Sequence, residues 1–177
     1  MNFLTNSSFC YFKKRTIVGV RVKDGVVFGV EKQVISPMIV EGSSSRIFTV
    51  GRNAGMAVAG VMADARQLVN RARKEANEWK SLYLDTIPPK ILNERVSAYV
   101  QFYTLFSHLR PFGCSALLAG YDEREGPKLY MVDPSGISYG YFGVSIGKNK
   151  SAAKTEIEKL KLNELTCRQA VIEISKM

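Results

Sequence analysis

The side chains that could carry out catalysis or bind a metal are few in this sequence, and their spacing favours neither activity. The chain has one histidine, His108, and three cysteines, Cys10, Cys114 and Cys167. Zinc and redox sites need cysteine or histidine ligands at short, repeated spacings such as CxxC, which these residues lack. We therefore predict no metal site and no cofactor. Cys114 and Cys167 are interpreted as buried apolar side chains, and His108 as a surface or structural residue near a helix end.

The first element that could position a site is a β-hairpin at residues 16–32. Valines alternate with glycine and arginine along residues 18–22, and such β-branched side chains fit a half-buried strand. The sequence KDG at residues 23–25 supplies a tight turn, because Asp-Gly tolerates positive φ. Residues 26–30 are almost continuously apolar, so we expect the second strand to be buried on both faces. Residues 1–15 show neither helical nor strand period and are expected to be loosely ordered.

Further short segments have the composition of strands, with turns rich in glycine, proline and serine between them. The DPSG turn at residues 133–136 accounts for Asp133 and Ser135, which could otherwise act as an acid and a base. We predict strands at residues 34–37, 46–50, 54–60, 114–121, 128–132 and 138–146.

Two predicted helices separate these strands into two blocks. Apolar residues recur three or four positions apart over residues 62–83, which predicts a long amphipathic helix whose buried stripe ends with a tyrosine. Arg71 and Glu75 are expected to form an ion pair on its solvent-facing side. The buried stripe of the second helix ends at Phe106. Arg110 precedes a proline and therefore avoids helical dihedrals, which predicts the end of this helix.

Two more helices are predicted after Gly147. Ala153, Ile157 and Leu160 lie on one face of the first, and the second opens with a capping box at residues 166–169. Strands followed by two helices occur twice in succession, which predicts a single α+β domain of antiparallel sheets with helices outside them.

The composition of the whole chain is that of an ordinary folded domain. Of its 177 residues, 46% are hydrophobic and 23% are charged, which argues against disorder. The net charge of +9 could suit nucleic acid, but most cations alternate with glutamates along the helices, which is typical of solvated faces. No apolar run reaches the roughly 18–20 residues that a membrane helix requires. We therefore expect neither nucleic acid nor a membrane as a partner.

Four motifs in succession resemble those of the alpha-type subunits of the proteasome core particle. They are GVMADAR at residues 60–66, RPFG at 110–113, DPSG at 133–136, and IGK at 146–148 followed by AAK at 152–154. The hairpin at residues 16–32 resembles the opening of the same fold, which belongs to hydrolases whose nucleophile is their N-terminal residue. The resemblance implies a four-layer α/β/β/α sandwich.

The resemblance implies a structural role without catalytic residues. Active beta-type relatives use an exposed N-terminal threonine, assisted by its own amine or by a lysine. Here that position falls on Arg15, and Thr16 follows it within the chain. The lysine position is Arg46, whose guanidinium stays protonated and cannot act as a base, and the acidic helper is Glu31. An active threonine peptidase of the beta type, which would need a free N-terminus at Thr16, and a basic nucleic-acid-binding protein are the alternatives.

The resemblance also implies partners and a candidate binding site. The partners would be other alpha subunits in a heteroheptameric ring, the beta subunits, and regulatory caps, in ubiquitin-dependent protein degradation in the cytoplasm and nucleus. The helix from Met62 to about Leu82 is expected to face the beta ring. In some alpha subunits a lysine at the position of Arg46 lines a pocket for the C-terminal carboxylate of a cap. Arg46, Gly60 and Val61 are therefore the candidate partner-binding residues, since arginine also binds carboxylates.

The resemblance covers about residues 16–177 and departs from the family pattern at both ends. Alpha-type chains carry an N-terminal signature and a helix that have no counterpart in residues 1–15. They also continue past the fourth helix with a further helix and two strands. We interpret the sequence as an alpha-type domain shortened at both ends, with residues 1–15 as an atypical N-terminal segment.

Overall fold

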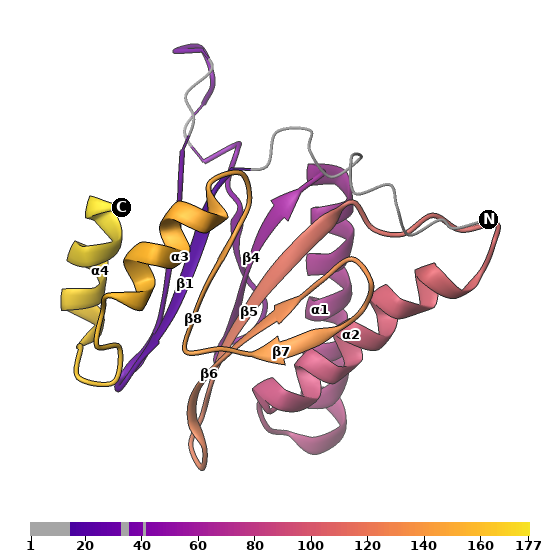
Figure 1. Ribbon diagram of the computed structural model, residues 1–177. Coiled ribbons are helices and arrows are strands. Elements are labelled where there is room, and N and C mark those ends of the chain that lie inside the picture. The colour runs from indigo at the N-terminus through magenta and orange to yellow at the C-terminus, as the bar shows by residue number, and fades with distance from the viewer. Residues whose placement is uncertain (1–14, 33–35, 41) are drawn as a thin grey trace.

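The computed structural model describes residues 15–32, 36–40 and 42–177, which form two antiparallel sheets between layers of helices (Figure 1). Two predictions, the loose order of residues 1–15 and the strand at residues 34–37, fall largely outside these described residues.

Among the described residues, the larger sheet has five strands in the order β3-β4-β5-β6-β7, and the smaller has three in the order β2-β1-β8. The predicted hairpin is confirmed, because Val20 of one strand lies opposite Val27 of the other. The strands are β1 (Ile17–Val22), β2 (Gly25–Val30), β3 (Ile47–Thr49), β4 (Ala54–Gly60), β5 (Cys114–Asp122), β6 (Gly126–Val132), β7 (Ser138–Gly140) and β8 (Gly143–Ile146).

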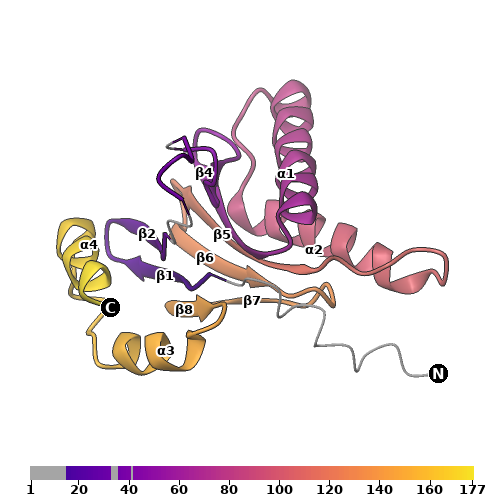
Figure 2. The ribbon, with the colours of Figure 1, turned by 90° about the horizontal axis from the view of Figure 1, so that it is seen from above.

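Helices cover the outer face of each sheet. In the described part of the chain, α1 (Met62–Tyr83) and α2 (Pro89–Leu105) pack against the larger sheet, whereas α3 (Lys150–Glu158) and α4 (Cys167–Lys176) pack against the smaller one (Figure 2). The predicted α+β, four-layer α/β/β/α sandwich is therefore confirmed. The predicted capping box of α4 is also confirmed, since the backbone amide of Gln169 donates to Thr166 Oγ1 and the backbone amide of Thr166 donates to Gln169 Oε1.

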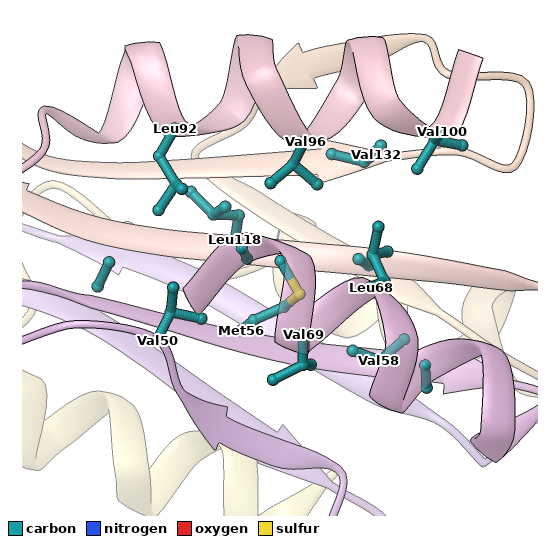
Figure 3. Packing of buried hydrophobic residues seen from close by; sticks show 14 of the residues in the cluster. Val50, Met56, Val58, Leu68, Val69, Leu92, Val96, Val100, Leu118 and Val132 are labelled. Atoms are coloured by element: carbon teal, nitrogen blue, oxygen red, sulfur yellow. The ribbon is translucent and has the colours of Figure 1, made fainter. Parts of the chain in front are cut away.

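Buried apolar side chains fill the spaces between the layers. Under α1 and α2, Met56 and Leu118 of the larger sheet meet Leu68 of α1 and Val96 of α2 (Figure 3). Between the two sheets lie Ile17, Ala57, Ala59, Leu117, Leu129, Val144 and Ile146. Between the smaller sheet and its two helices lie Val18, Val20, Val22, Ala153, Ile157 and Ala170. Because α1 and α2 share one core with the larger sheet, residues at the start of α1 and after the end of α2 can meet.

The single strand predicted over residues 138–146 is wrong, because the chain forms two strands there that belong to different sheets. Tyr139 of β7 lies opposite Met131 in the larger sheet, and Ser145 of β8 lies opposite Val18 in the smaller sheet. The chain crosses between the sheets at Tyr141, whose amide donates to the Leu129 carbonyl in the larger sheet. The carbonyl of the next residue already accepts a hydrogen bond from the amide of residue 21 in the smaller sheet.

Several predicted boundaries and burials also need correction. Strand β2 packs on both faces as predicted but is only half-buried along its length, because it forms an edge of its sheet. Helix α2 ends at Leu105, and Phe106 follows in an extended conformation and is exposed. Tyr83 at the end of α1 is 59% exposed. Leu160 lies beyond the end of α3.

Candidate functional site

Thr16 lies immediately before β1, next to the residue that follows β2. Its amide nitrogen donates to Glu31 Oε2 at 3.4 Å, and the Glu31 amide donates to the Thr16 carbonyl at 3.0 Å. Hydrogen bonding from Thr16 lowers the pKa of Glu31, and the positive charges of Lys148 and Arg15 act in the same direction. The Thr16 nitrogen belongs to a peptide bond with Arg15, so it is a donor to Glu31 and not a free amine that could accept a proton.

Arg46 precedes β3 and reaches the end of β4. Its Nη1 atom donates to the Gly60 carbonyl at 3.0 Å and to the Val58 carbonyl at 3.4 Å. Burial lowers the pKa of Arg46, and the positive charge of Arg15 adds to this effect. A guanidinium nevertheless stays protonated at neutral pH. The structure thus brings Arg46 and Gly60 together, and Val61 follows directly as the residue that precedes α1.

The first turn of α1 is tied to the segment that follows α2 by a buried carboxylate. Asp64 is 6% exposed and accepts from two nitrogens of Arg110, Nη1 and Nη2, each at 2.7 Å, and from the amide of Gly113 at 2.8 Å. Hydrogen bonding from Arg110 holds the pKa of Asp64 below its usual value and raises that of Arg110. The motifs GVMADAR and RPFG, which sequence analysis treated separately, therefore form one structural unit, the Asp64 clamp.

Gly60 allows the backbone of the Asp64 clamp to close. Its φ of +131° lies in the region that favours glycine, and a Cβ at this position would lie against the Gly113 carbonyl and within 2.7 Å of Cys114 Cα. The amide of Val61 donates to the same Gly113 carbonyl at 3.0 Å. The end of β4 and the start of β5 can therefore approach closely only because residue 60 has no side chain.

The predicted ion pair of Arg71 and Glu75 forms, but it does not face solvent as predicted, because Glu75 is only 4% exposed. Arg71 pairs with it from the preceding turn, and Arg95 of α2 donates to Glu75 Oε2 at 2.9 Å. Sequence analysis missed Arg95, since a pair at i,i+4 spacing predicts an exposed helix surface and carries no sign of a third partner on another helix. We call this group the Glu75 cluster.

The remaining candidate residues have ordinary environments. His108 is exposed and lies near the ring of Phe106, with ring centroids 5.7 Å apart. Cys114 is buried as predicted. Cys167 is only half-buried, and its pKa is raised by burial and by Asp24. Cys10 falls outside the described residues.

The predicted DPSG turn is confirmed. The Gly136 amide donates to the Asp133 carbonyl at 2.9 Å, and the Ile137 amide lies 3.4 Å from Ser135 Oγ. In the part of the chain that the structure describes, no group of three or more His, Cys, Asp or Glu side chains could hold a metal ion. None of the helices in that part has both the length and the apolar character needed to cross a membrane.

Comparison with protein families and curated proteins gives consistent matches. The family described as "Proteasome subunit" matches residues 12–177. The chain is 58% identical over 162 residues to the proteasome subunit alpha type-3 of Arabidopsis thaliana, which covers 92% of this chain and 65% of that protein. It is 54% identical to the protein of the same name from Acanthamoeba castellanii, covering 92% of this chain and 64% of the relative.

A more distant relative is the probable proteasome subunit alpha type-7 of Saccharomyces cerevisiae, at 41% identity over 92% of this chain and 57% of the relative. The chain thus spans 65% or less of the length of these three relatives. Because the family match extends over residues 12–177 and includes all four motifs that carried the resemblance, the chain belongs to the proteasome subunit family.

Proposed function

We propose that this chain is a non-catalytic, structural alpha subunit of the proteasome core particle. The observation that carries the proposal is the environment of Arg46. Where the active members of the family have a base lysine, this chain has a guanidinium that donates to the Val58 and Gly60 carbonyls. The names of the relatives favour an alpha-type over a beta-type chain.

The proposal includes the partners and the place of action. The chain would occupy one position in a heteroheptameric alpha ring, whose heterologous interfaces close by rotation, and would contact beta subunits through α1. The assembled particle would degrade ubiquitin-tagged proteins in the cytoplasm and nucleus, and regulatory caps would bind to the alpha ring.

Assembly is the direct test of this role. The tagged chain would be co-expressed in a eukaryotic cell, and native gels and sedimentation would show whether it enters the core particle. We expect co-migration with the particle. Recovery of the chain only as a monomer or an aggregate, in cells whose other alpha subunits assemble normally, would overturn the structural role.

The beta-type alternative makes a different prediction for the N-terminus. A threonine peptidase needs the amine of Thr16 to be free, whereas the proposed subunit keeps Arg15 attached to it. N-terminal sequencing of the chain recovered from the particle distinguishes the two. A start at Thr16 would contradict the non-catalytic assignment.

We also propose that Arg46, with Gly60 and Val61, contributes to the binding of a cap's C-terminal carboxylate. Nη1 of Arg46 is occupied by backbone carbonyls, but a guanidinium has five N–H donors and the side chain is half-exposed. Core particles that contain Arg46→Met are expected to bind a cap more weakly than wild-type particles, whereas Arg46→Lys particles should retain binding. Equal binding by all three would remove this role.

A further inference from the structure

An open cleft of about 390 Å³ lies at the surface between α1 and α2, and the Glu75 cluster forms part of its wall. The cleft is distinct from Arg46 and from the Asp64 clamp, since it contains none of their residues. It is lined by Arg71, Glu75, Arg95, Ala98, Tyr99 and Phe102.

The two arginines of the cleft are held in place by contacts within this chain, before any other subunit binds. Both pair with the buried carboxylate of Glu75. Arg71 of α1 also lies over the Tyr99 ring of α2, 4.9 Å from its centroid, and Arg95 of α2 lies over the Trp79 ring of α1, at 5.4 Å. Each arginine therefore crosses from its own helix to the other, and the guanidinium groups are preorganised for a ligand.

The charges and hydrogen bonds of this cleft are not balanced. Two arginines pair with one glutamate, which leaves a net positive charge. Nε of Arg71 is buried and has no hydrogen-bond partner, although a buried donor without a partner is destabilising. The side chains of Arg71 and Arg95 are 36% and 38% exposed, so a group from outside can reach them. The exposed parts of the two guanidinium groups can therefore donate to one more negatively charged acceptor.

We propose that this cleft receives the carboxylate of an aspartate or glutamate side chain from a neighbouring subunit. A carboxylate matches the planar donors of two guanidinium groups, and it would neutralise the remaining charge. Phe102, 48% exposed, forms an apolar wall of the cleft, so the acidic residue should be flanked by an apolar one. This inference rests on the proposed function, because the carboxylate is supplied by another subunit of the particle.

Ala98 offers a test that leaves both arginines and Glu75 unchanged. It is exposed, lies on α2 and lines the cleft. Ala98→Glu would supply a carboxylate from within the chain, three residues from Arg95, and would repel the partner's acid. Ala98→Gln has the same size without the charge. Both variants would be tagged and compared with wild type for incorporation into core particles in competition with an untagged wild-type chain.

We expect Ala98→Glu to reduce incorporation by about tenfold, as loss of a desolvated charge pair does, and Ala98→Gln to stay within about twofold of wild type. Thermal unfolding of the free variants would separate this loss from misfolding. Equal incorporation of all three chains would show that no partner uses the cleft. An equal loss in both variants would show that a partner contacts the cleft without recognising its charge. Either of these two results would overturn the inference and leave the proposed function standing. Failure of the wild-type chain to assemble would instead overturn the proposed function, and this inference with it.

Discussion

Helix α1 buries two carboxylates, and the chain neutralises them in different ways. Asp64, in the first turn, meets one arginine through both of its oxygens and also accepts from a backbone amide. Glu75, three turns later, meets two arginines, one from its own helix and one from α2. Asp64 is therefore matched in charge by Arg110, whereas the Glu75 cluster keeps one positive charge in excess.

This difference separates a structural contact from a surface that can bind a partner. Both oxygens of Asp64 accept hydrogen bonds within the chain, and its contacts join α1 to the start of β5, so this carboxylate is satisfied without a partner. The Glu75 cluster keeps an excess positive charge on two arginines that are more than a third exposed and line an open cleft. Burial of a charge is thus compatible with either role, and the balance of donors and acceptors decides between them.

The largest effect is expected from a change that opens the Asp64 clamp without altering any charge. Gly60→Ala places a methyl group against the Gly113 carbonyl and forces alanine to adopt a φ of +131°. We expect the free energy of unfolding to fall by about 3 kcal/mol or more, measured by urea denaturation. Gly51→Ala is the control, because its Cβ would meet no atom closer than 3.7 Å. Similar stabilities of the two variants would contradict the close approach at Gly60.

A direct change at the clamp should have the next largest effect. Asp64→Asn keeps the shape of the side chain but removes the charge that two nitrogens of Arg110 share, and we expect a loss of about 2 kcal/mol in unfolding free energy. Glu78→Gln, on the exposed side of the same helix, is the matched control and should change stability by less than about 0.5 kcal/mol. If both variants lost the same amount, the clamp would contribute nothing beyond an exposed pair.

The clamp also predicts how stability depends on pH. The pKa of Asp64 is lower in the folded chain than its ordinary value of 3.8, so the unfolded state takes up the proton first as the pH falls. The contribution of Asp64 is therefore present above that value and is lost as the pH falls through the folded pKa. We expect the stability difference between wild type and Asp64→Asn to shrink between about pH 5 and pH 2. A difference that stays constant over this range would contradict the lowered pKa.

A smaller loss of stability is expected at the Glu75 cluster. Glu75→Gln leaves an oxygen that can accept from one arginine, whereas Asp64 also accepts from a backbone amide, that of Gly113, in addition to its arginine. We expect a loss of about 1 kcal/mol, less than that of Asp64→Asn. Glu94→Gln, an exposed position on α2, is the control. A loss larger than that at Asp64 would mean that the cluster, and not the clamp, is the stronger polar contact of α1.

Sequence patterns predicted the elements that depend on nearby residues. Helix α1 begins at residue 62 as predicted and ends at residue 83, within one residue of the predicted end, and the capping box at Thr166 formed as expected. The order of strands in a sheet is not a local property, which is why the edge position of β2 was missed. Tyr141 stands in a run of residues that reads as one strand, and only the presence of two separate sheets makes the chain cross there.

The polar contacts of α1 were predicted only in part for the same reason. Arg71 and Glu75 are four residues apart, and their pairing follows from helix geometry. Arg95 joins them from another helix, and Arg110 reaches Asp64 across 46 residues, so neither contact has a signal in the local sequence. The resemblance to a family identified the motifs on both sides of the clamp, but not the bond between them.

The smallest expected effects concern the shape of the cation at the two carboxylates. Arg110 contacts Asp64 through two nitrogens, which a lysine cannot reproduce, so we expect Arg110→Lys to lose about 1 kcal/mol of unfolding free energy. Arg95 contacts Glu75 through Nη1 alone, and a lysine ammonium can replace a single contact, so Arg95→Lys should lose about 0.5 kcal/mol, largely from its stacking on Trp79. Urea denaturation of both variants measures the difference. The opposite order would show that the ring contact of Arg95 contributes more to stability than the two-nitrogen contact of Arg110.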